Sequence, residues 1–201
     1  MNEGRVFGFA GRWLPRLRVY GREVGAVIRV DVAELERRQE ICMEPLCDPD
    51  LMSALAVLPY RTPISWDTID PVIQATLDNA PEGTLLKGRR TVERIYRPAL
   101  DVVGIVKRSK SWLVALEAVS LFAPHAPRGL VLLGQGDDRS VRLRAVQVGV
   151  GLARHQPVSG TVLLERPSRA HVRGGPKHWA FTEVVLAQWL ELHNSSAQAF
   201  S

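Results

Sequence analysis

Residues 97–119 read RPALDVVGIVKRSKSWLVALEAV, and this stretch determines the predicted fold. It contains two apolar runs separated by the polar residues KRSKS, a pattern typical of two strands joined by a turn. Each run carries one carboxylate, Asp101 in the first and Glu117 in the second. An ionised carboxylate on an apolar strand is unfavourable unless it is paired or bound to a metal. These two acids are therefore the first candidates for a functional site.

An antiparallel pairing centred near Ser109 would place Asp101 directly opposite Glu117. Like charges in that position destabilise a sheet, whereas a hard cation such as Mg²⁺ can hold two carboxylates at one place. The two acids therefore predict a magnesium site. The other interpretation is that one or both acids reach the sheet edge or pair with an arginine: Arg94, Arg97 or Arg144.

Turn and cap signals predict the elements around this stretch. Residues 16–30 alternate as a β-hairpin that turns near Gly21. Asp31 is the expected N-cap of a short helix over 31–43, and Asp70 followed by Pro71 begins another that ends at the APEG of residues 80–83. A proline-rich connector over 44–71 contains a short helix at 49–57. A buried strand over 158–168 and an amphipathic helix over 180–196 complete the chain.

The segment SVRLRAVQVGVGLARH, residues 140–155, has two interpretations. Its apolar residues nearly alternate, and Gly149 and Gly151 would each cost a helix about 1 kcal/mol relative to alanine, which favours a strand. Leu143, Val146 and Val150 also form a helical stripe, which favours a helix. Propensity leans toward the strand, and both interpretations stay open.

The order of these elements resembles the catalytic core of the PD-(D/E)XK nuclease superfamily, particularly its RecB-like branch, over about residues 67–168. In that family one strand carries an Asp, the next carries Glu-x-Lys, and a following helix carries a Gln. The matching residues here are Asp101 shortly after Pro98, Glu117, and Gln147. The resemblance implies a restriction-endonuclease-like core, Asp101 and Glu117 as metal ligands, and a helix over 140–154.

One position departs from the family pattern, because Val119 stands where the family has its lysine. That lysine helps to position or activate the attacking water beside the metal. Lys107, Lys110 or Arg144 could replace it from a displaced position, and Lys110 is the predicted catalytic lysine. The resemblance therefore implies either a Mg²⁺-dependent nuclease or a catalytically degenerate, DNA-binding relative.

Basic residues favour a polyanionic partner. The chain has 26 Lys and Arg against 21 Asp and Glu, a net charge of +5. They cluster at residues 87–90, 107–110, 139–144 and 168–179, although such clusters can also be solvated loops. The predicted nucleic-acid-binding residues are Lys87, Arg89, Arg90, Arg144, Arg169, Arg173, Lys177 and Trp179.

Several kinds of site and location are disfavoured. Cys42 and Cys47 are the only cysteines, too few for a closed zinc or cluster site, and free thiols are favoured over a disulfide between them. No apolar run approaches the ~18 to 20 residues of a membrane span, and the N-terminus lacks the features of a secretory signal, so a cytoplasmic location is expected.

The predicted fold class is α/β or α+β, with a mixed central sheet and flanking helices. The expected organisation is an N-terminal extension over 1–66 that contains the β-hairpin, a nuclease-like core over 67–195, and a tail over 196–201. The alternative function is that of a non-catalytic subunit of a larger protein or nucleoprotein assembly. In that case the closing helix with Trp189 and the arginine-rich N-terminus would form its interfaces.

Overall fold

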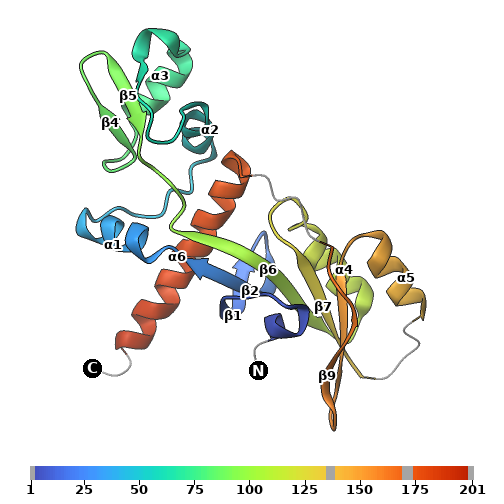
Figure 1. Cartoon of the computed structure of the whole chain (residues 1–201). Helices are drawn as coiled ribbons and strands as arrows, with labels where there is room; N and C mark the ends of the chain where they lie inside the picture. The colour runs from blue at the N-terminus through green and yellow to red at the C-terminus, as the bar shows by residue number, and fades with distance from the viewer. Residues whose placement is uncertain (1–2, 135–138, 169–173, 199–201) are drawn as a thin grey trace. The chain divides into compact units, whose positions relative to one another are not determined.

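The computed structural model describes residues 3–134, 139–168 and 174–198 (Figure 1). The chain divides into two compact units. Unit 1 comprises residues 1–29 and 101–172, and unit 2 comprises residues 30–100 and 173–201. The chain thus leaves unit 1 after its first hairpin and returns to it at Asp101. The boundary expected at residue 66 falls inside unit 2, so the division of the structure differs from the predicted one.

Unit 1 is built on a mixed six-stranded sheet with the order β1-β2-β6-β7-β8-β9. The strands β6, β7 and β8 are parallel, whereas β1 pairs antiparallel with β2 and β8 with β9. Together with the flanking helices this confirms the mixed sheet and makes the fold α+β. The strands are β1 (Arg12–Val19), β2 (Arg22–Val30), β6 (Leu100–Ser109), β7 (Arg128–Leu133), β8 (Gly151–Gln156) and β9 (Gly160–Glu165).

The β1–β2 hairpin turns at Tyr20 and Gly21, where the sequence predicts it. Both residues have positive φ, 53° and 69°, as a two-residue turn of type I′ requires. The hairpin is not a separate extension, however, because β2 lies beside β6 in the six-stranded sheet. The hairpin of the expected N-terminal extension is in fact one side of the main sheet, and the rest of that extension, from residue 30 on, belongs to unit 2.

Two helices connect the parallel strands of unit 1. Helix α4 (Trp112–Ser120) lies between β6 and β7, and α5 (Arg139–Gln147) precedes β8. Parallel neighbours need such crossovers. The segment 140–155 therefore contains both predicted conformations: the helix ends at Gln147, Gly149 takes a φ of 66°, and β8 begins at Gly151. The helix that the nuclease resemblance implies over 140–154 covers only the first half of that range.

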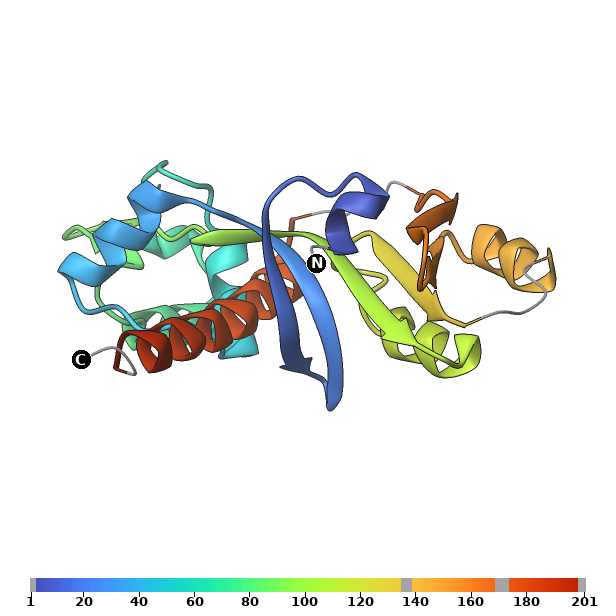
Figure 2. The same cartoon turned by 90° about the horizontal axis from the view of Figure 1, so that it is seen from below.

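The first residues of the chain lie against the sheet of unit 1 (Figure 2), where three glycines face their aromatic side chains. The short 3-10 helix η1 (Glu3–Phe7) presents Phe7, and Phe9 follows it. A Cβ atom built at Gly104 would lie 2.2 Å from the Phe9 ring, and one at Gly129 would lie 2.6 Å from the Phe7 ring. Gly151, the register partner of Gly129, also faces Phe7. The aromatic rings therefore pack directly on the backbone of three neighbouring strands.

Unit 2 combines helices with a three-stranded sheet of order β3-β5-β4. Asp31 and Asp70 cap their helices as predicted, since their side chains accept hydrogen bonds from the backbone N–H groups of Glu34 and Val72. The elements are α1 (Val32–Glu40), α2 (Pro49–Val57), β3 (Ile64–Ser65), η2 (Trp66–Thr68), α3 (Pro71–Asp78), β4 (Leu85–Lys87), β5 (Thr91–Arg94) and α6 (Pro176–Gln198). Helix α6 packs on α2.

Candidate nucleic-acid interface

The structure does not bring the two predicted metal ligands together. Glu117 lies on helix α4 and not on a strand, and its exposed carboxylate pairs with the guanidinium of Arg22 at the start of β2. Asp101 is an exposed residue at the start of β6. The prediction of two adjacent strands that carry Asp101 and Glu117 side by side is therefore wrong.

Chain geometry also keeps these acids apart. From Asp101 to Ser109 the strand β6 rises about 26 Å, whereas Glu117 lies only about 8 Å along the axis of α4 from Trp112. Even a helix that folds straight back along the strand makes up only about 8 Å of that rise. Glu117 also pairs with Arg22, whose neighbour Glu23 accepts a hydrogen bond from Lys107 near the other end of β6. Carboxylates that share one Mg²⁺ ion must each reach within about 2.1 Å of it. Asp101 and Glu117 cannot form the predicted magnesium site in this structure.

The other predicted catalytic residues, Lys110 and Gln147, lie elsewhere in unit 1. Lys110 is exposed in the connection between β6 and α4, and Val119, which stands in place of the family's lysine, is fully buried on the inner face of α4. Gln147 ends α5, where its amide oxygen accepts a hydrogen bond of 3.3 Å from the predicted DNA-binding residue Arg144. Within residues 3–134, 139–168 and 174–198, no three His, Cys, Asp or Glu side chains are grouped so as to hold a metal ion. None of the helices described in the structure is both long and apolar enough to cross a membrane.

The basic residues 87–90 occupy the end of the hairpin formed by β4 and β5. Lys87 is the last residue of β4 and Thr91 the first of β5, so Gly88, Arg89 and Arg90 form a three-residue connection. The N–H group of Gly88 donates to the carbonyl of Thr91 at 2.8 Å, and a Cβ at Gly88 would lie only 2.7 Å from the Thr91 hydroxyl. Glycine therefore permits the tight turn that presents the three cations.

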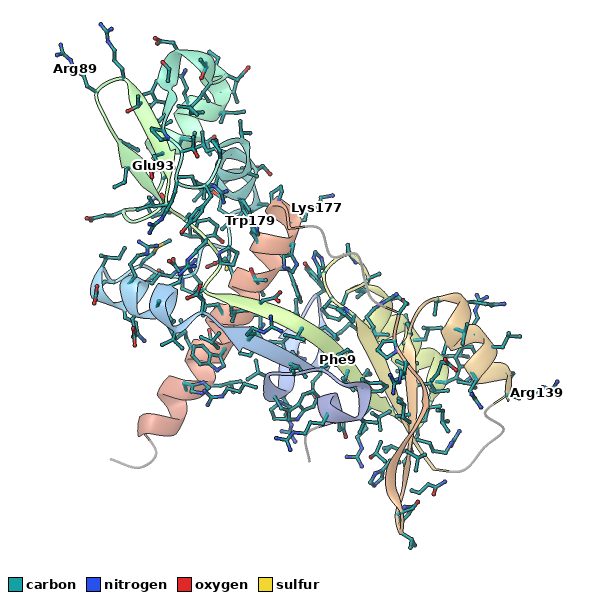
Figure 3. The ribbon with its side chains drawn as sticks, in the orientation of Figure 1. Phe9, Arg89, Glu93, Arg139, Lys177 and Trp179 are labelled. Atoms are coloured by element: carbon teal, nitrogen blue, oxygen red, sulfur yellow. The ribbon has the colours of Figure 1, made fainter. Side chains whose placement is uncertain are left out.

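The side chains at this hairpin end are directed into solvent. Lys87, Arg89 and Arg90 are all exposed, and Arg89 extends away from the end of the hairpin in Figure 3. The Lys87 ammonium donates a hydrogen bond to the carbonyl oxygen of Asp78 at 2.7 Å, which does not neutralise the charge of the lysine. Among the described residues, no carboxylate forms an ion pair with Arg89 or Arg90. We call Lys87, Gly88, Arg89 and Arg90 the basic tip.

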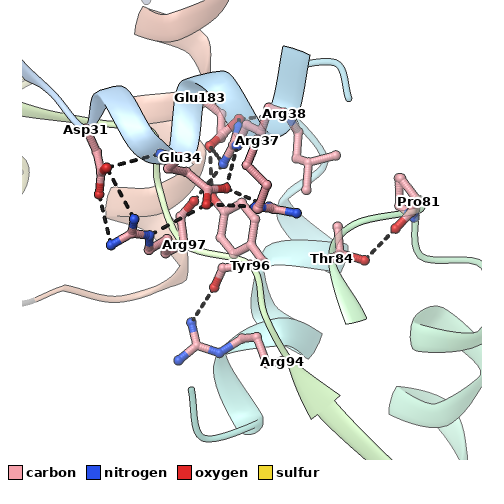
Figure 4. Close-up of polar contacts among 11 residues, drawn as sticks. Asp31, Glu34, Arg37, Arg38, Pro81, Thr84, Arg94, Tyr96, Arg97 and Glu183 are labelled. Atoms are coloured by element: carbon pink, nitrogen blue, oxygen red, sulfur yellow. Dashed lines mark hydrogen bonds and ion pairs between the residues drawn. The ribbon is translucent and has the colours of Figure 1, made fainter. Parts of the chain in front are cut away.

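Other arginines of unit 2 are, in contrast, engaged in its interior (Figure 4). The buried carboxylate of Glu183 on α6 accepts two hydrogen bonds of 2.9 Å from Arg38, one of 2.9 Å from the Tyr96 hydroxyl and one of 2.9 Å from the Leu46 N–H. Burial alone would lower the pKa of Arg38, but the hydrogen bonds and charge of Glu183, together with the hydrogen bond to Glu34, outweigh it and raise that pKa. Burial raises the pKa of Tyr96, and the Glu183 charge raises it further.

A second buried carboxylate, Glu34, extends this network. It pairs with Arg37 at 2.7 Å, with Arg38 at 3.0 Å and with Arg97 at 3.5 Å. Burial would raise the pKa of Glu34, but the hydrogen bonds and charges of Arg37 and Arg38 prevail and lower it. Arg97 also pairs with the capping residue Asp31 at 2.9 Å. The cations of this region are therefore compensated by acids, unlike those of the basic tip.

Trp179, predicted to stack on a base, has a structural role. The Arg94 guanidinium lies 4.6 Å from the centre of its ring, and Tyr96 contacts it edge-on at 5.8 Å. The indole also packs against the main apolar cluster of unit 2. Lys177, two residues earlier on α6, is exposed (Figure 3). The predicted residues Arg169 and Arg173 lie outside the described residues.

The structure reveals one aromatic residue among cations that the sequence analysis missed. Tyr60 is 39% exposed, and the guanidinium groups of Arg94 and Arg61 lie 5.5 and 5.7 Å from the centre of its ring. Arg94 is buried, which lowers the pKa of its guanidinium. Arg61 is exposed to solvent. The sequence signal was the pair YR at residues 60–61 in a proline-rich connector, where no periodicity assigns a face. Tyr60 and Arg61 are further candidates for contact with a nucleic acid.

Comparisons of the chain with protein-family models, with curated proteins and with solved structures found no match. The resemblance to the PD-(D/E)XK nucleases thus stays a prediction. The strand position of Glu117 on which it rested is not observed.

Proposed function

We propose that this protein binds nucleic acid through unit 2, with the basic tip as the principal contact, and that it does so without a catalytic site at Asp101 and Glu117. The observation that carries the proposal is the contrast between the two sets of cations in this unit. Arg38 and Arg97 are paired with carboxylates, whereas Arg89 and Arg90 present uncompensated charge at the end of a hairpin.

The chemistry of the tip suits a phosphate backbone. Arginine and lysine contacts to phosphates release condensed counterions, and this release supplies most of the affinity of sequence-independent binding. A hairpin end is narrow enough to approach a groove or a single strand, and the Gly88 turn holds its three cations together. The partly exposed ring of Tyr60, beside Arg61, provides an aromatic surface in the same unit on which an unpaired base can stack.

Binding to fluorescein-labelled single- and double-stranded DNA, followed by fluorescence anisotropy at several salt concentrations, tests this function. The variant Lys87→Ala/Arg89→Ala/Arg90→Ala is expected to bind at least about tenfold more weakly at about 50 mM salt. The slope of log K against log salt for duplex DNA should become shallower by up to about 2.7, or about 0.9 for each phosphate that the protein no longer neutralises.

A matched control distinguishes the tip from net charge. The variant Arg139→Ala/Arg142→Ala/Arg144→Ala removes the same charge from helix α5 in unit 1, another basic cluster of the sequence. This control variant is expected to weaken DNA binding less than the basic-tip variant does, and to keep most of the slope of log K against log salt. Equal losses in the two variants would show that binding follows net charge alone, and unchanged binding in the tip variant would refute the proposed contact.

A second candidate function, that of a subunit in an assembly, is favoured by exposed apolar side chains on α4. Leu113, Val114 and Leu121 at its C-cap are 62, 54 and 45% exposed, and apolar side chains exposed together are typical of a protein interaction site. Trp189, the interface residue expected from the sequence, is instead buried at 6% exposure. Sedimentation analysis should show self-association that Leu113→Glu/Leu121→Glu abolishes. A monomer at all concentrations would count against a second copy as the partner.

A further inference from the structure

Unit 1 contains an open pocket of about 430 Å³ that the nucleic-acid proposal does not use. It is lined by residues of β1, β2, β6 and β7, and by Glu3 of η1. Its volume falls in the range of about 300 to 1,000 Å³ that is usual for small-molecule sites. The lining residues that bear on its chemistry are Glu3, Trp13, Arg16, Glu23, Lys107 and Arg108.

An indole ring forms one wall of this pocket. A Cβ atom built at Gly25 would lie 2.1 Å from Cη2 of Trp13, so the ring rests directly on the backbone of β2. A larger residue at position 25 would push the indole away. Trp13 remains partly exposed, although the side chain has substantial apolar area to bury. A partly exposed indole in a pocket is suited to stack on a planar ring.

Cations line the same pocket. The Lys107 ammonium donates to the carbonyl oxygen of Glu23 at 2.6 Å, and the Arg108 guanidinium donates to the carboxylate of Glu3 at 3.1 Å. The exposed Arg16 makes no ion pair with any carboxylate of the described residues. Because the Glu3 charge offsets that of Arg108, Arg16 and Lys107 supply the positive charge available to a ligand.

The formal charge of the pocket limits the kind of anion it takes. Three cations and two carboxylates, Glu3 and Glu23, leave a net charge of +1. A phosphate monoester carries about −1.5 to −2 charges at pH 7, so the pocket offsets roughly half of the charge of a single phosphate, whereas a run of phosphates would leave far more charge unopposed. The remaining carboxylate of Glu23 can accept hydrogen bonds from hydroxyl groups such as those of a sugar.

We propose that this pocket binds a nucleoside monophosphate, with the base stacked on Trp13 and the phosphate held by Arg16 and Lys107. This site lies in unit 1 and does not depend on the basic tip of unit 2. Its existence can therefore be tested whether or not the protein binds DNA.

Isothermal titration calorimetry of the full chain with adenosine 5′-monophosphate, adenosine and inorganic phosphate tests the site. The monophosphate is expected to bind at least about tenfold more tightly than either fragment. Arg16→Ala should weaken its binding about tenfold, because a charge-assisted hydrogen bond is removed, and should leave adenosine binding unchanged. Trp13→Leu should weaken the binding of both adenosine and the monophosphate.

Arg29→Ala provides the matched control. Arg29 is an exposed cation on β2 that does not line the pocket, so its removal should leave the affinity for the monophosphate within about twofold. Since Arg16 is exposed, the substitution Arg16→Ala should not unfold the protein. The titration of this variant therefore tests the proposed site even if Trp13→Leu destabilises the protein. Failure of the monophosphate to bind at millimolar concentration, or equal effects of Arg16→Ala and Arg29→Ala, would overturn the proposal.

Discussion

Replacing Glu183 by alanine is expected to lower the free energy of unfolding of unit 2 by about 3 to 5 kcal/mol. The carboxylate is fully buried and accepts four hydrogen bonds, from Arg38, Tyr96 and Leu46. Its removal leaves the Arg38 guanidinium, whose side chain is 2% exposed, with an uncompensated charge on that side. Arg38 keeps its contact with Glu34, but Glu34 is shared with Arg37 and Arg97, and a buried charge that loses its own partner costs far more than the net contribution of the original pair.

Chemical unfolding in urea, followed by circular dichroism, measures this effect as a shift of the midpoint. Glu183→Gln keeps the shape and an acceptor oxygen, and should be less destabilising than Glu183→Ala. The double variant Arg38→Met/Glu183→Leu removes both charges and should recover much of the stability, since apolar replacements of a buried ion pair are often neutral. A Glu183→Ala protein within about 1 kcal/mol of the natural one would show that this network does not hold unit 2 together.

The location of this network could not be predicted from the sequence, although its parts are visible there. Glu183 reads as one acid on an amphipathic helix, and its partner Arg38 lies 145 residues earlier in the chain. The caps Asp31 and Asp70, by contrast, were predicted correctly because each binds a backbone N–H within three residues. Local signals determine a cap, whereas a buried ion pair depends on how distant elements meet.

The error over residues 112–120 has a physical reason. Apolar residues follow one another there, and a short apolar run fits either a buried strand or a helix. Most of its residues are good helix formers, including Leu116 and Ala118, and Ser111 caps the helix by accepting a hydrogen bond from the N–H of Val114. As a helix, the segment buries Ala115, Ala118 and Val119 and turns Glu117 to solvent. Glu117, which is unexpected on a buried strand, is thus a surface residue of a helix. The N-cap Ser111 was the sequence signal that favoured a helix over a strand.

The exposure of the basic tip, unlike the conformation of residues 112–120, could be predicted from the sequence. Charge alone predicts residues 87–90 as a contact, and the structure places them at the end of an exposed hairpin. The composition of residues 168–179 predicts that Trp179 stacks on a base, yet the Arg94 guanidinium lies over its ring. Charged side chains are rarely buried without a partner, so a cluster of cations without nearby acids predicts exposure well. An aromatic residue carries no such constraint, and its role depends on its neighbours.

The substitution Gly104→Ala is expected to lower the free energy of unfolding of unit 1 by about 1 to 3 kcal/mol. Its new methyl group would lie 2.2 Å from Cδ2 of Phe9, far inside van der Waals contact. Phe9 is itself buried among Val27, Val106 and Val131, so the ring cannot withdraw into solvent without giving up that packing. The first residues of the chain thus depend on glycine at a central strand of the sheet.

A double-mutant cycle with Phe9→Ala separates this clash from any general intolerance of β6 to a side chain. Phe9→Ala alone should be destabilising because it leaves a cavity over the sheet. In the double variant the methyl group at position 104 enters the space that the ring has left, so Gly104→Ala should cost much less there than in the natural background. The coupling is expected to be at least about 1 kcal/mol, since the two residues are in contact. Additive effects would mean that Phe9 does not rest on Gly104, and that the N-terminal segment does not complete the sheet of unit 1.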